Sequence, residues 1–313
     1  MNTRRSKWLA AASALAIASM VASNLYNYAM AKWAAAAAYQ TQQALLQHTA
    51  EAPNRYRLLV PVIVELLGRL IPVGNQPLAS FLVGYALFYQ FSIMFSLLLL
   101  LIYLRQWYSP AQALVGVLVV AVSLLVAFGD GYFQPWSLLE IGLFTAGLLA
   151  IYKSQHWWLA VLIALATLNR ETGVFLVLAY LVMRAKRTWP FVTRADLLWT
   201  GLYGAIWGSL YGGVRLWLGP APQLALIQIQ QMNLQPGALL MTAVNGFLFL
   251  GVFWVFVWRG RQTADPFIRA TWRIVPIYLL AVLVFGVWVE VRLITPLYPI
   301  LISTGLSAWE AAA

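Results

Sequence analysis

Long apolar runs separated by short polar turns occupy most of this chain. The runs are about 12–25 residues long and lack strict alternation of apolar and polar positions, which favours helices over the strands of a membrane β-barrel. Backbone polar groups must be paired internally in lipid, and a helix pairs its own. The pattern therefore predicts an all-α, polytopic transmembrane helical bundle with about ten crossings.

The order of the runs predicts one transmembrane domain, 1–313. Its first crossing is 8–23, an outer loop follows at 24–78, and the remaining crossings fill 79–313. The basic start and small-residue apolar run also fit a cleaved signal peptide, although the run is long enough to cross the membrane. Both interpretations place the residues after position 23 outside.

Two segments of the outer loop predict helices that do not cross. The segment 31–48 is rich in alanine and glutamine, which favours a helix at the outer interface. The segment 58–73 is too short and too charged for a crossing, because it carries Glu65 and Arg69 one helical turn apart. We expect a re-entrant or surface helix there.

A pair of short apolar runs, 157–168 and 173–183, stands out among the later segments. Each arm is about 17 Å long at 1.5 Å per residue, against a hydrocarbon core of about 30 Å. The turn 169–172 is therefore expected within or near the outer half of the membrane. The other later runs predict full crossings, at 81–104, 111–128, 136–152, 197–218, 238–258, 274–289 and 294–308.

The composition excludes a water-soluble fold. Hydrophobic residues make up 62% of the chain and charged residues only 9%, and the mean hydropathy is +0.77. Soluble domains are about 45–50% apolar and about 25% charged. Membrane lipids are therefore the expected surroundings of this protein.

The net charge of +11 could indicate a nucleic-acid partner. The basic residues lie in short loops between apolar runs, however, where they act as topology determinants, so we predict no nucleic-acid partner. The positive-inside rule predicts a multi-pass protein of the bacterial inner (cytoplasmic) membrane with a cytoplasmic N-terminus. The basic residues assigned to the inside are Arg4, Arg5, Lys7, Arg105, Lys153, Arg184, Lys186, Arg187, Arg194, Arg259, Arg261, Arg269 and Arg273.

The chain has no cysteine and two histidines, His48 and His156, which lie far apart. This excludes a disulfide framework, a thiol nucleophile and a bis-histidine haem within the bundle. We predict no metal site and no cofactor. A divalent metal ion stays open but has no support in the sequence.

Charged residues at membrane depth are costly and usually face a protein interior or a wet cavity. By topology, four segments bring such residues to the outer half of the bundle. These residues are Arg55 and Arg57, Asp130 and Glu140, Arg170 and Glu171, and Glu290 and Arg292.

Each of these residues has a structural and a functional interpretation. Arginines and carboxylates at helix ends form structural salt bridges, or they build an anion site in which arginines bind a phosphate. Asp130, between two glycines, is an exposed turn residue or a general base. For Glu140, a capping or interhelical hydrogen bond is favoured over catalysis.

Three motifs together resemble the GT-C-type membrane glycosyltransferases. The run WWLAVLIALATLNRETGVFLVLAYLVMR (157–184) is similar to their short-helix pair. VEVRLITPLYPILI (289–302) is similar to their late charged-then-proline segment, and APNRYRLLVPVIVELL (52–67) to the first-loop region of uncharacterised bacterial members. The resemblance implies a GT-C-like bundle with a broken-helix pair and periplasmic interfacial helices.

The resemblance also implies an enzyme that takes a sugar from a polyprenyl-phosphate donor at the outer face. A carboxylate would deprotonate the acceptor hydroxyl, which attacks the anomeric carbon as the lipid phosphate leaves. Carried over by motif, Arg170 and Arg292 steady the phosphate, and Glu171 and Glu290 position these arginines.

One departure from the family concerns the acid that such enzymes carry soon after the first helix. Residues 24–50 contain no Asp or Glu, so Glu51 or Asp130 would have to serve as the base. Otherwise the chain is a non-catalytic GT-C-like subunit that packs with other membrane subunits. A transporter with broken helices is a third interpretation, but no inverted repeat relates the two halves.

Overall fold

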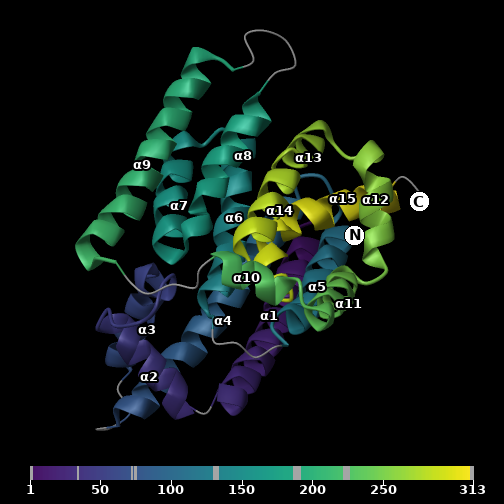
Figure 1. Cartoon of the computed structure of the whole chain (residues 1–313). Coiled ribbons are helices and arrows are strands. Elements are labelled where there is room, and N and C mark those ends of the chain that lie inside the picture. Colours follow the sequence, from purple (N-terminus) through teal and green to yellow (C-terminus); the bar gives the residue numbers. More distant parts are fainter. Residues whose placement is uncertain are drawn as a thin grey trace.

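The computed structural model describes residues 3–33, 35–71, 73, 76–129, 134–185, 192–220 and 226–310. Every regular element within these ranges is a helix (Figure 1). This confirms the all-α prediction. The first half of the chain contains α1 (Thr3–Trp33), α2 (Ala35–Leu46), η1 (Asn54–Tyr56), α3 (Leu59–Leu70), α4 (Pro77–Leu104), α5 (Pro110–Ala127) and α6 (Trp136–Tyr152).

The second half is also helical and contains several interrupted helices. Its elements are α7 (His156–Asn169), η2 (Glu171–Gly173), α8 (Val174–Arg184), α9 (Arg194–Leu218), α10 (Leu226–Asn233), α11 (Pro236–Leu250), α12 (Phe253–Thr263), α13 (Pro266–Thr271), α14 (Ile274–Phe285), η3 (Val291–Leu297) and α15 (Tyr298–Glu310).

Length and composition qualify five of the described helical segments to cross a membrane. These segments are Leu9–Ala31, Pro77–Leu104, Pro110–Ala127, Pro266–Phe285 and Val291–Trp309, and α11 with α12 would add a sixth. The protein thus has the helices of a multi-pass membrane protein. The larger number of about ten crossings stays a prediction, because helices such as α6 and α7 are apolar but short.

The predicted crossing 274–289 ends earlier in the structure, at Phe285 of α14, and two other predicted crossings differ more. The first helix continues to Trp33 instead of ending at residue 23. Asn24 is accommodated within it, because its side-chain amide donates to the carbonyl of Met20 at 2.8 Å. The predicted crossing 238–258 is broken between α11 and α12, which meet at 67°. Gly251 occupies the left-handed region there, with φ of 52°.

The two predicted outer-loop helices are present as α2 and α3, and both pack against α4. The amide of Gln42 on α2 donates to the carbonyl of Pro61 at 2.9 Å, and its oxygen accepts from the Tyr85 hydroxyl of α4 at 3.0 Å. Glu65 and Arg69 form the expected pair one turn apart, at 2.8 Å. The buried amide of Gln42 therefore connects α2, α3 and α4.

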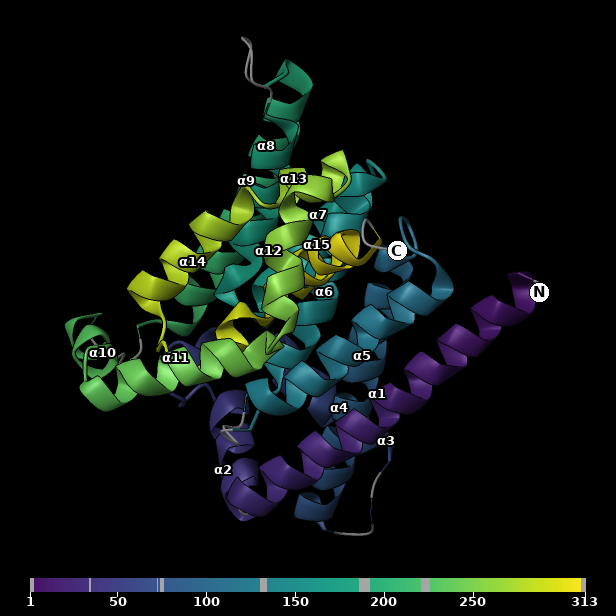
Figure 2. The same cartoon turned by 90° about the vertical axis from the view of Figure 1, so that its right-hand side faces the viewer.

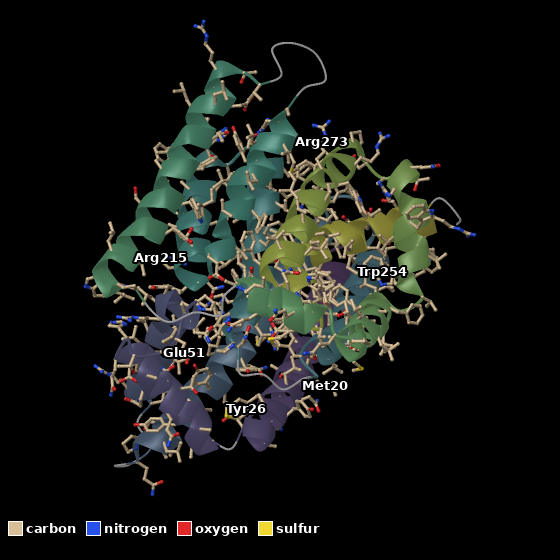
Figure 3. All side chains as sticks on the ribbon, viewed as in Figure 1. Met20, Tyr26, Glu51, Arg215, Trp254 and Arg273 are labelled. Carbon is tan, nitrogen blue, oxygen red and sulfur yellow. The ribbon has the colours of Figure 1, made fainter. Side chains whose placement is uncertain are left out.

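One end of the bundle gathers loops that were assigned to the inside. The ring of Trp107 contacts Tyr152 and Phe267, at centroid distances of 4.9 and 5.7 Å. The guanidinium of Arg273 donates to the carbonyls of Val182 and Ala185. We call this the basic end, formed by residues 105–109, 152–156, 182–185, 192–196 and 258–273; in Figure 3, Arg273 lies there and Glu51 lies toward the other end.

The core runs along α4, α6 and α15, which are surrounded by the other helices (Figures 1 and 2). α12 lies directly on α15 at Gly260, where an added Cβ would come within 1.8 Å of the carbonyl oxygen of Thr304. Only glycine permits this approach. Because α6, the turn after α7 and η3 lie deep in the body, the charged residues on them are brought inside.

Candidate functional site

The broken pair predicted from the short apolar runs is present as α7, η2 and α8. Arg170 ends α7 because its backbone is extended, with φ of −163° and ψ of 148°. Gly173 packs so closely on the preceding turn that an added Cβ would lie 2.8 Å from the backbone nitrogen of Thr167. The chain therefore reverses tightly and holds Arg170 and Glu171 at the apex.

Arg170 forms a buried ion pair with Glu140 of α6. Its Nη1 lies 2.7 Å from Glu140 Oε2 and also donates to the Ser137 hydroxyl at 3.3 Å. The hydroxyl of Thr172 donates to the other carboxylate oxygen of Glu140. Both charged side chains are over nine-tenths buried. The interhelical hydrogen bond predicted for Glu140 is thus confirmed.

Glu171 pairs with Arg57, which lies between η1 and α3. Arg57 Nη2 lies 2.8 Å from Glu171 Oε1, Arg57 Nη1 donates to Asn54 at 3.0 Å, and the guanidinium lies 4.9 Å from the ring of Trp136. Burial lowers the pKa of Arg57 and the charge of Arg170 lowers it further, while the carboxylate of Glu171 counteracts both. The site thus holds two buried arginines side by side.

These four residues, Arg57, Glu140, Arg170 and Glu171, form what we call the four-charge cluster. Adjacent side chains on an extended backbone point to opposite sides, so Arg170 and Glu171 reach different partners. The resemblance implies that Glu171 positions Arg170; in the structure the ion-pair partner of Arg170 is Glu140, to which Thr172 donates. The cluster has no net charge, and Glu171 is its most exposed member at 33%.

The predicted pair of Glu290 and Arg292 is formed at 2.9 Å, and Arg292 is fully buried. Tyr278 of α14 lies beside this pair, because its hydroxyl donates to the carbonyl of Leu293 at 2.7 Å. The structure therefore brings Arg57, Glu140, Arg170 and Glu171 together, and η3, which carries Arg292, packs against α6.

Arg55 and Glu51 form no contact with the cluster among the described side chains. Arg55 donates to the carbonyls of Leu218 and Pro220, the latter at 3.2 Å, and so caps the C-terminal end of α9. Glu51 is exposed in the loop before Arg55 (Figure 3). Asp130 lies outside the described residues. Neither proposed base therefore has a described position at the cluster.

Sequence reasoning missed several polar groups that surround Arg170. Trp136 Nε1, Asn169 Oδ1 and Arg170 Nε are buried and have no hydrogen-bond partner in the described part of the chain. The spacing of Trp136, Ser137 and Glu140 along one helical face could have signalled this. Buried donors without acceptors are rare and usually meet water or an ion.

One pocket lies at the four-charge cluster, and a second lies elsewhere in the bundle. The first, of about 10 Å³, suits one water molecule and is lined by Glu140, Phe144, Ala166, Thr172, Gly173 and Leu176. The second, of about 330 Å³, lies between α1 and α5 and is mainly apolar. Its lining residues are Asn24, Leu25, Tyr28, Leu125, Phe128 and Gly129.

The described residues contain no group of three His, Asp or Glu side chains that could hold a metal ion. Comparison of the chain with protein-family models, with characterised proteins and with solved structures gives no significant match. The function must therefore be argued from the charged cluster itself and from the motifs that surround it.

Proposed function

We propose that this chain is a membrane glycosyltransferase that moves a sugar from a polyprenyl-phosphate donor to an acceptor at the outer face. The observation that carries the proposal is Arg170, a buried arginine with an unpaired Nε–H beside a second buried arginine, Arg57. Guanidinium groups with spare donors in a dry site suit a phosphate. The four-charge cluster is the proposed phosphate-binding part of the site.

In the proposed reaction the acceptor hydroxyl attacks the anomeric carbon while the bond from that carbon to the donor phosphate breaks. The hydroxyl proton passes to a carboxylate, and the leaving lipid phosphate keeps the bonding electrons. Arg57 and Arg170 stabilise the charge that develops on the phosphate. Glu140, which accepts a hydrogen bond from Thr172, holds Arg170 in position. Glu51 and Asp130 stay proposed as the base.

A direct test is release of polyprenyl phosphate by the purified chain in nanodiscs, supplied with polyprenyl-phosphate hexoses and pentoses and a mixture of lipid and glycan acceptors. We expect turnover with at least one donor and at least a tenfold loss in Arg170→Lys. Arg69→Lys is the matched control, since Arg69 forms an exposed pair with Glu65. Turnover that is equal in both variants would contradict the proposed site.

A second candidate is a non-catalytic GT-C-like subunit of a larger membrane complex. The observation that favours it is that each carboxylate of the cluster already has an arginine partner, beside a pocket of only about 10 Å³. Added undecaprenyl phosphate separates the two candidates. A rise in the thermal midpoint of the chain supports the transferase, and no change supports the subunit.

A further inference from the structure

We propose that the basic end contains a binding site for a phosphodiester group, supplied by an anionic phospholipid, and that Arg261 is its centre. The site lies at the end of α12 and is independent of the proposed transferase function. Its residues are Trp258, Arg261 and Trp272, which we call the tryptophan-framed arginine.

The end of α12 is held firmly against the body of the protein. Gly260 packs on the backbone of α15 so closely that an added Cβ would clash with Thr304. The neighbouring Trp272 donates from its indole N–H to the hydroxyl of the same Thr304 at 2.8 Å. Thr304 thus contacts both Gly260, which precedes Arg261, and the ring of Trp272 beside Arg261.

The guanidinium of Arg261 lies over two indole rings. Its central carbon is 4.7 Å from the ring centroid of Trp272 and 5.5 Å from that of Trp258. Such stacking covers the planar faces of a guanidinium and leaves the N–H groups at its edge available. Arg261 is exposed, so this edge is accessible to a ligand.

The cations near Arg261 also lack acidic partners. Arg259, Arg261 and Arg269 are exposed and form no ion pair with the described side chains. Asp265, the acid closest to them in sequence, is engaged at the start of α13, where it accepts from the backbone N–H of Phe267 at 2.8 Å. The uncompensated positive charge favours an anionic ligand.

The apolar neighbours of the site indicate that this ligand is a lipid. Trp258 is 73% exposed, and Val255 and Phe256 on the same helix are exposed, as is Val252 just before it. An exposed apolar helix that ends in tryptophan and arginine is typical of the headgroup level of a membrane. Anionic headgroups attract basic residues at that level.

Native mass spectrometry of the full chain in detergent tests this site, with dioleoylphosphatidylglycerol as the probe and dioleoylphosphatidylcholine as the neutral comparison. We expect Arg261→Ala to weaken phosphatidylglycerol binding about fivefold or more, and Arg261→Lys to weaken it less. The control is Arg194→Ala, an exposed arginine of the same end that begins α9. It should have a smaller effect.

Three outcomes would overturn the proposal. Equal losses in Arg261→Ala and Arg194→Ala would show diffuse attraction by the whole basic end. Equal binding of phosphatidylcholine would exclude recognition of an anionic headgroup. Displacement of the lipid by millimolar inorganic phosphate would assign the site to soluble phosphate instead of lipid. Unchanged thermal midpoints in the variants would exclude a loss of binding through misfolding.

Discussion

Arg170 and Glu171 are neighbours in the chain, yet each forms its ion pair with a different segment. Arg170 reaches Glu140 of α6 at 2.7 Å, and Glu171 reaches Arg57, between η1 and α3, at 2.8 Å. The extended backbone of Arg170 makes this divergence necessary. One turn between two short helices thus joins three parts of the bundle through buried charge.

Removing the carboxylate of Glu140 should destabilise the protein strongly. Glu140→Ala leaves Arg170 buried and without its ion-pair partner, which costs about 3–5 kcal/mol. Glu65→Ala, which removes an exposed pair, should cost at most about 1 kcal/mol. Thermal midpoints in detergent measure both, and similar shifts in the two variants would contradict the burial argument.

The α12–α15 contact predicts opposite results for two glycines. Gly260→Ala places a Cβ within 1.8 Å of the Thr304 carbonyl, so α12 must move and the protein should lose stability by several kcal/mol. Gly208→Ala on α9 has no atom within 4 Å of the added Cβ, and alanine favours a helix by about 0.5–1 kcal/mol. Its thermal midpoint should therefore stay unchanged or rise.

Arg55 should act on α9 and leave the four-charge cluster intact. Arg55→Ala removes the donors to the carbonyls of Leu218 and Pro220, hydrogen bonds worth about 0.5–1.5 kcal/mol each because water can replace the donor at this partly exposed helix end. Hydrogen exchange should increase in the last turn of α9. It should stay unchanged in η2, and faster exchange in η2 would show that Arg55 also supports the cluster.

The start of α9 should weaken at low pH. Partial burial raises the pKa of Asp196, but hydrogen bonds from Thr193 and Tyr180 and the charge of Arg184 outweigh this effect and hold the pKa below its usual value. The stabilisation is therefore present above the unfolded pKa of about 3.9 and is lost as the pH falls through the lower folded value. Hydrogen exchange at residues 194–200 measures it, and Asp196→Asn should abolish the pH dependence.

Parts of the fold could be predicted because strong local signals bound them. The sequence predicts the helix 136–152 with its observed ends, because Pro135 and Lys153 flank a mainly apolar run. The broken pair was predicted to within one residue. The bend at Gly251 was missed, because a single glycine in an apolar run does not reveal a left-handed backbone.

The site could be predicted only in part. Topology placed Arg57, Glu140, Arg170 and Glu171 in one region, but partner choice depends on the extended backbone at Arg170, which no residue pattern encodes. Arg55 resembled Arg57 in sequence, yet it lies two residues earlier and reaches α9 instead. The unpaired state of the groups around Arg170 depends on tertiary packing, although the spacing of Trp136, Ser137 and Glu140 already places polar groups on one helical face.

Binding of undecaprenyl phosphate, measured by thermal shift or native mass spectrometry, tests the central claim most directly. Wild-type protein should bind it, and Arg170→Lys should weaken binding about 10-fold to 100-fold, because a charge-assisted hydrogen bond is worth about 1.5–3 kcal/mol. Arg69→Lys should bind as wild type. Equal affinity in Arg170→Lys and Arg69→Lys would contradict a phosphate site at the four-charge cluster.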